Sequence, residues 1–97
     1  MDQLTRLRNW YACQCDGDWE HSYGIKFDTL DNPGWTLEVD IADTELEERP
    51  FVAVHRGDSE EDGSWMHCNV AGGKFQATGG VPDLPEMLER FLEWAGH

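Results

Sequence analysis

The stretch QCDGDWEHSYGIKFDTLDNPGW, residues 14–35, decides the fold, because the periodicity of the chain changes within it. Apolar residues recur at helical spacing before it and alternate with polar ones from residue 22 onward. Its segments 16–18 (DGD) and 31–34 (DNPG) are typical of turns. It also carries two tryptophans, which solvated loops rarely contain. The stretch is therefore either a functional site or a structural corner.

Two alternating runs, residues 22–30 and 35–42, predict a β-hairpin around the DNPG turn. Pro33 is expected at the first central position of that turn and Gly34 at the second, with a positive φ. Alternation places one set of side chains toward the core, namely Tyr23, Ile25, Phe27, Trp35, Leu37, Val39 and Ile41.

Helices are expected at both ends of the chain. Residues 3–14 carry an apolar stripe at helical spacing, with polar side chains on the opposite face. A final helix is predicted to begin after Asp83, and Glu86 three residues later completes the pattern of a capping box.

Three shorter strands are predicted between the hairpin and the final helix, at residues 51–56, 64–70 and 74–78. The charged segment 57–63 is expected to be the loop of a second hairpin. This order predicts an α+β fold, in which an antiparallel β-meander of four to five strands is flanked by an N-terminal and a C-terminal helix packed on one face. With 97 residues, the whole chain (1–97) is expected to form one domain.

The charge is strongly acidic, with 20 Asp and Glu residues against 7 Lys and Arg and a formal net charge of -13. Such a surface repels nucleic acid and anionic membranes and attracts basic proteins. No segment approaches the roughly 20 apolar residues that span a bilayer. An odd number of cysteines without a signal peptide predicts a cytoplasmic protein with reduced thiols.

The alternative function with a chemical activity is a small metal-binding or thiol enzyme that uses Cys15, His21 and Cys68. Structural zinc requires four ligands, usually from paired cysteine knuckles, and that spacing is absent from the sequence. Neither an oxyanion hole nor a phosphate-binding loop is indicated near these residues. We therefore expect no catalytic residue, no metal and no cofactor.

Acidic side chains around tryptophans predict a protein-binding face instead, because aromatic residues anchor a partner and charges steer it. Trp19 and Trp65 have no clear inward assignment, so each is either an exposed anchor within an acidic rim or a side chain that fills the core of a small domain. The candidate partner-binding residues are Asp16, Asp18, Trp19, Glu20, His21, Glu38, Asp40 and Trp65. A generic acidic interaction domain for some other basic partner remains an alternative at this point.

The chain also resembles the bacterial immunity protein 53 family. The resemblance lies in QCDGDWEH (residues 14–21) and TLDNPGW (residues 29–35), and it extends over nearly the whole chain. Further matching positions are Trp10-Tyr11, Tyr23-Gly24-Ile25, Asp40, Leu46-Glu47, Phe51, Trp65, Lys74-Phe75 and Gly79-Gly80.

That resemblance implies an immunity protein of a bacterial polymorphic toxin system. Such a protein binds and neutralises a cognate toxin in a stoichiometric, non-catalytic complex. Many toxins of these systems are nucleases with basic surfaces, so the resemblance implies a basic toxin as partner and no cofactor. It leaves open the identity of the toxin, the oligomeric state, and whether QCDGDWEH contacts the toxin.

Overall fold

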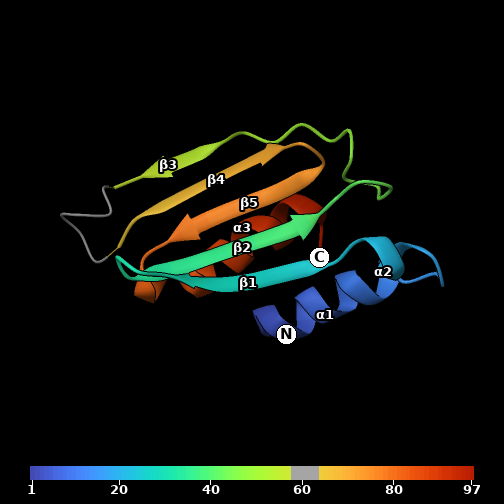
Figure 1. The fold of residues 1–97 in the computed structure, drawn as a ribbon, viewed down its shortest axis with the longest axis horizontal. Helices are drawn as coiled ribbons and strands as arrows, with labels where there is room; N and C mark the ends of the chain where they lie inside the picture. Colours follow the sequence, from blue (N-terminus) through green and yellow to red (C-terminus); the bar gives the residue numbers. More distant parts are fainter. Residues whose placement is uncertain (58–63) are drawn as a thin grey trace.

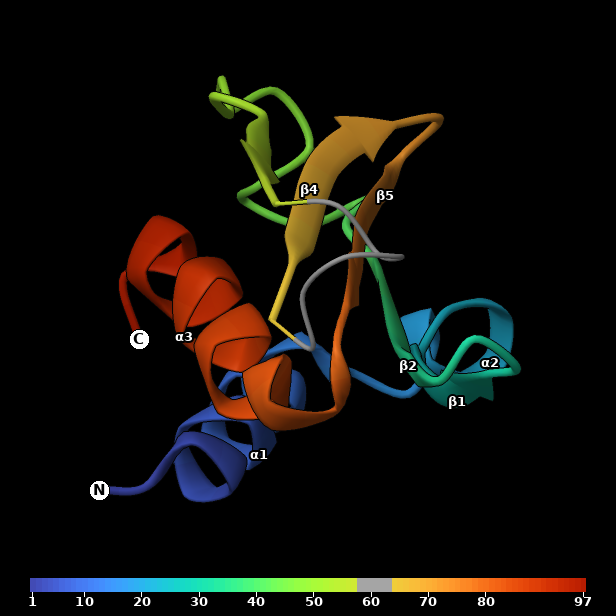
Figure 2. The same cartoon turned by 90° about the vertical axis from the view of Figure 1, so that its left-hand side faces the viewer.

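A computed structural model describes residues 1–57 and 64–97 of the chain. The fold is α+β: a five-stranded antiparallel sheet carries the N-terminal and C-terminal helices on one face (Figure 1, Figure 2). In chain order the elements are α1 (Gln3–Gln14), α2 (Trp19–Ser22), β1 (Ile25–Leu30), β2 (Gly34–Asp40), β3 (Val54–Arg56), β4 (Met66–Ala71), β5 (Lys74–Gly79), the 3-10 turn η1 (Val81–Asp83) and α3 (Leu84–Ala95). The predicted fold class and the placement of both helices on one face are confirmed.

Both terminal helices form where the apolar periodicity predicts them. Helix α1 begins after Asp2, whose carboxylate accepts a hydrogen bond from the Thr5 N–H at 2.7 Å. Helix α3 ends at Ala95, and the next residue, Gly96, adopts a left-handed φ of 78° and donates its N–H to carbonyls of the last turn. Each end therefore has a local cause that is visible in the sequence.

The start of α3 differs from the prediction, because Asp83 does not cap it. Its carboxylate instead accepts hydrogen bonds from the Trp65 N–H and the Ser64 hydroxyl, both at 2.8 Å. The predicted capping box is wrong, since a long-range partner takes the oxygen atoms that the local pattern assigns to the helix.

The strands do not form a simple meander, and their order is β1-β2-β5-β4-β3. After β2 the chain crosses to the far edge of the sheet and returns through β4 and β5, so that β5 pairs with β2 (Figure 1). The meander expectation is wrong because alternation shows which side chains face the core but not which strands pair. The predicted second hairpin is confirmed as β3–β4, although residues 58–63 of its loop lie outside the described residues.

The first hairpin pairs as predicted, with Phe27 opposite Leu37, but its turn works differently. Gly34 does not have the expected positive φ. Instead, a Cβ atom at Gly34 would collide with the carbonyl oxygen of Gly79 on β5. Glycine is required here because two central strands approach closely, rather than for the geometry of the turn.

The core lies between the sheet and the helices and is rich in aromatic side chains. Trp10 of α1 is fully buried and meets Phe91 of α3 edge to face, with ring centroids 4.9 Å apart. Phe75 of β5 packs on Phe91 from the sheet side, at 5.2 Å. This cluster joins both helices to the central strand. Across the described residues, the structure contains no helix of the length and apolarity needed to cross a membrane.

Candidate functional site

The QCDGDWEH segment (residues 14–21) connects α1 to α2 and folds back on itself through reciprocal hydrogen bonds. The Asp16 carboxylate accepts from the N–H groups of Asp18 at 3.0 Å and Trp19 at 2.9 Å. The Glu20 carboxylate accepts from the N–H groups of Asp16 at 3.0 Å and Gly17 at 2.8 Å. Two of the carboxylates predicted to bind a partner therefore also hold this loop in shape.

These hydrogen bonds favour the charged form of both carboxylates. The N–H groups of Trp19 and Asp18 lower the pKa of Asp16. The pKa of Glu20 is lowered by its own backbone N–H and by those of Asp16 and Gly17. The loop consequently keeps its negative charge to a lower pH than free carboxylates would.

Both candidate tryptophans are buried and fill the core, which was the alternative to an exposed anchor. Trp19 is 5% exposed, and its indole Nε1 donates to the carbonyl of Ala42 at 2.9 Å. Trp65 is also 5% exposed, and its ring lies edge to face with His67 at 5.4 Å. Neither indole is available in the free protein as an exposed anchor for a partner.

A polar depression of about 340 Å³ opens beside α2. We call it the acidic corner, and its lining residues are Asp16, Asp18, Trp19, Ser22, Tyr23 and Asp43. Asp43 comes from the connection after β2, so the fold brings two distant acidic segments together. The Tyr23 hydroxyl lies 3.3 Å from the Asp43 carboxylate, and the negative charge of Asp43 raises the pKa of Tyr23.

Asp43 has a left-handed backbone, with a φ of 60°. Aspartate tolerates this conformation better than most residues, and such backbone strain often occurs at functional sites. Sequence reasoning assigned Tyr23 to the core and did not place it beside Asp43. The sequence signal for this contact was a tyrosine at the start of a half-buried strand, because the hydroxyl of a partly buried tyrosine needs a polar partner.

The remaining candidate residues are distributed over two surfaces. Asp18 and His21 are exposed on the loop and on α2. Glu38 and Asp40 lie on the outer face of β2, opposite Lys26 and Lys74 of the neighbouring strands. Asp40 is already engaged, since it accepts from Lys74 Nζ at 2.7 Å and from the Gly24 N–H at 2.9 Å. The acidic corner thus gathers Asp16 and Asp18 but not Glu38 or Asp40.

Within the part of the chain that the structure describes, the carboxylates of the acidic corner make no ion pair. Among the described residues, the ion pairs are made by other carboxylates, on β2, at Asp83 of η1 and on α3. The negative charge at the corner is therefore not neutralised within those parts of the chain. A basic surface would be attracted to it.

The cysteines do not support the thiol or metal alternative. Cys68 lies in the core, and burial raises the pKa of its thiol to about 11, so it remains protonated at neutral pH. Cys15 is exposed at the end of α1, and its thiol donates to the Tyr11 carbonyl. Over residues 1–57 and 64–97, no three His, Cys, Asp or Glu side chains are grouped to hold a metal ion.

Replacing Glu20 should weaken the loop in a pH-dependent way. A lowered carboxyl pKa contributes stability above the unfolded-state pKa, and this contribution is lost as the pH falls through the folded-state pKa. We expect Glu20→Gln to lower the melting temperature by a few degrees at pH 7 and by less at pH 3. Thermal unfolding followed by circular dichroism measures both values. Asp18→Asn is the matched control, because Asp18 makes no capping hydrogen bond. If the melting temperatures of both variants depended on pH in the same way, the stabilising role of the Glu20 carboxylate would be wrong.

Comparison with known proteins adds one match. A family model described as immunity protein 53 matches residues 4–96. The same comparisons found no significant match among curated proteins or among solved structures.

Proposed function

The chain belongs to the immunity protein 53 family, and on this premise we propose that it neutralises a cognate bacterial toxin by binding it at the acidic corner. The complex is stoichiometric and non-catalytic, and it needs no cofactor. The observation that carries this proposal is the group of carboxylates at the corner, which make no ion pair within residues 1–57 and 64–97, in a chain with a net charge of -13.

The charge of the corner supports a basic partner surface. Nucleases bind phosphates through basic side chains, and clustered carboxylates can occupy such a surface in place of the phosphates. A strongly acidic inhibitor also attracts a basic partner over distance, which accelerates association. We therefore propose a nuclease-type toxin whose substrate-binding surface is covered.

The rigidity of the corner supports tight binding. Asp16 and Glu20 are held by four backbone hydrogen bonds, and Trp19 anchors α2 to the core. Groups that are already ordered lose little conformational entropy when a partner binds. The buried Trp19 therefore contributes by positioning the acidic side chains.

We assign direct contact to the exposed side chains. Asp18 and His21 project from the loop and from α2, and Asp16 and Glu20 offer oxygen atoms beside them. Glu38 and Asp40 lie outside the acidic corner, on the outer face of β2. The proposal places the protein in the cytoplasm, where its three free cysteines remain reduced.

Charge reversal at Asp18 tests the location of the interface. We expect Asp18→Lys to lower the association rate with the toxin by roughly tenfold at low salt, and to reduce its dependence on salt. Asp31→Lys is the matched control, because it makes the same charge change in the turn between β1 and β2. Stopped-flow mixing with an inactive toxin variant measures both rates.

Two outcomes would contradict the proposal at different levels. Equal rates for both variants would move the interface away from the acidic corner while leaving the toxin as the partner. Co-expression with a candidate toxin from the same host tests the function itself. If co-expression with the protein fails to restore growth and no complex forms, the immunity function is wrong.

A further inference from the structure

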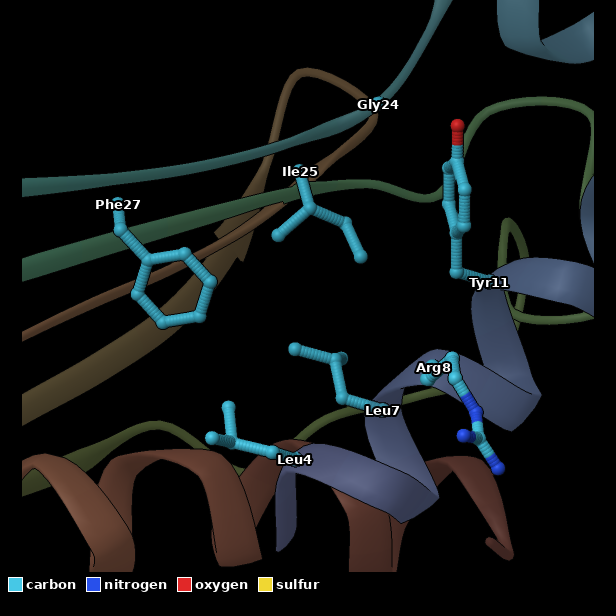
Figure 3. Close-up of a pocket in the computed structure, with 7 residues that line it drawn as sticks. All are labelled: Leu4, Leu7, Arg8, Tyr11, Gly24, Ile25 and Phe27. Carbon is cyan, nitrogen blue, oxygen red and sulfur yellow. The ribbon is translucent and has the colours of Figure 1, made fainter.

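An apolar groove of about 430 Å³ separates α1 from strand β1. We call it the β1 groove, and it is lined by Leu4, Leu7, Arg8, Tyr11, Gly24, Ile25 and Phe27. Figure 3 shows Ile25 and Phe27 pointing toward Leu4 and Leu7, while Arg8 points away from the groove. Leu4 is 67% exposed and Phe27 is 44% exposed. Two large apolar side chains are thus left open to solvent.

Strand β1 is an edge strand with unpaired backbone groups. The Asp40 N–H donates to the Gly24 carbonyl, so alternate residues from Gly24 onward bond to β2. Ile25, Phe27 and Thr29 therefore direct their N–H and C=O groups away from the sheet. The Thr29 N–H bonds to the Asp28 carboxylate at 2.8 Å, as expected for a donor without a strand partner.

Helix α1 projects past β1 on the side away from β2 (Figure 1), and it lies on the same side of the sheet as α3 (Figure 2). A further strand added to β1 would therefore pass over α1. Its inward side chains would cover Leu4 and close the open side of the β1 groove.

We propose that this strand is β1 of a second copy of the chain, paired antiparallel about a twofold axis at Phe27. In this register Phe27 faces the partner's Phe27 above the two grooves. Lys26 faces the partner's Asp28 on the outer face, and symmetry repeats this ion pair. The Thr29 N–H then bonds to the second strand, which frees Asp28 for the lysine.

The charges on β1 favour this register over its neighbours. A shift by two residues in one direction places Lys26 opposite the partner's Lys26, and a shift in the other direction places Asp28 opposite the partner's Asp28. Like charges directly opposite one another destabilise strand pairing. A shift by one residue turns the inner face of one copy to the outer side and separates the apolar surfaces.

Two basic side chains are consistent with this interface, Arg8 at the groove and Lys26 on the outer face of β1. Within the described residues, neither Lys26 nor Arg8 makes an ion pair.

Two copies that each carry a net charge of -13 repel one another at a distance. Salt screens this repulsion, so the dimer should strengthen as salt increases, whereas binding of a basic toxin should weaken.

A charge swap tests the dimer and its register. We expect Lys26→Asp and Asp28→Lys each to weaken dimerisation by about tenfold, and the double variant to restore it. The two single variants change the net charge in opposite directions, so general repulsion alone would not weaken both. Sedimentation equilibrium from micromolar to submillimolar protein, at low and high salt, measures the dimer constant.

Three results would overturn the proposal. The first is a monomer at every concentration and salt, and the second is a dimer that both single variants leave unchanged. The third is a monomeric protein in which Lys26→Asp impairs toxin neutralisation, because the groove would then belong to the toxin. Failure of the dimer leaves the acidic corner intact, since Asp18→Lys tests that surface separately.

Discussion

Gly34→Ala should destabilise the protein by about 3 kcal/mol, a cost typical of severe overpacking in a core. The new methyl group would meet the carbonyl oxygen of Gly79, and a backbone atom cannot move aside without disturbing the ladder between β2 and β5. That ladder joins the first hairpin to the other three strands. Urea unfolding followed by tryptophan fluorescence measures the free energy change.

Gly24→Ala provides a matched control for Gly34→Ala. Gly24 lies just before β1, and a Cβ atom there would have no neighbour within 4 Å. We expect its free energy of unfolding to stay within about 0.5 kcal/mol of the wild type. Equal stability of the two variants would show that close approach of the strands is not what requires glycine at position 34.

The parts of the fold that follow from local pattern were predictable. The apolar stripe located α1 at residues 3–14, and alternation assigned the side chains of β1 and β2 to the correct faces. The prediction that Phe27 lies in the core is wrong, because its side chain is 44% exposed at the edge strand. The DNPG sequence indicated the position of the turn. It did not indicate the role of Gly34, because the deciding contact is made by Gly79, far away in the sequence.

Strand order depends on contacts that periodicity does not contain. The alternating pattern of residues 35–42 is compatible with pairing to β3 or to β5, and the structure pairs them with β5. The burial of Trp19 was hidden for the same reason, since its hydrogen-bond partner is Ala42 in a distant connection. A tryptophan in a short acidic segment resembles an exposed anchor until the surrounding core is known.

The candidate site, like the fold, was predictable only where it depends on local sequence. The loop sequence made Asp16, Asp18 and Glu20 candidates, and the structure brings Asp16 and Asp18 together. Tyr23 and Asp43 join them only through folding, because Asp43 follows the end of β2. The hydrogen bonds of Asp16 and Glu20 also show that an unusual motif can serve the fold and a binding surface at once.

Asp83→Ala should destabilise the protein by about 3 kcal/mol, because it leaves the buried N–H of Trp65 without an acceptor and removes a largely buried carboxylate that faces Arg56. Asp83 is 6% exposed and accepts from the Trp65 N–H and the Ser64 hydroxyl. Its carboxylate also lies 3.5 Å from the Arg56 guanidinium. These contacts join the β3–β4 hairpin to the start of α3, so their loss should loosen one end of the sheet.

Two further variants separate burial from charge at this position. Asp83→Asn keeps one acceptor oxygen but brings an NH₂ group toward the existing donors. We therefore expect its loss of unfolding free energy to be smaller than that of Asp83→Ala and larger than that of the control variant Glu86→Gln. Glu86→Gln is that control: it also removes a carboxylate paired with Arg56, but one that is partly exposed to solvent. Exposed ion pairs contribute less than about 1 kcal/mol. If Glu86→Gln were as destabilising as Asp83→Ala in urea unfolding, charge pairing with Arg56 rather than the buried hydrogen bonds would hold α3 to the hairpin.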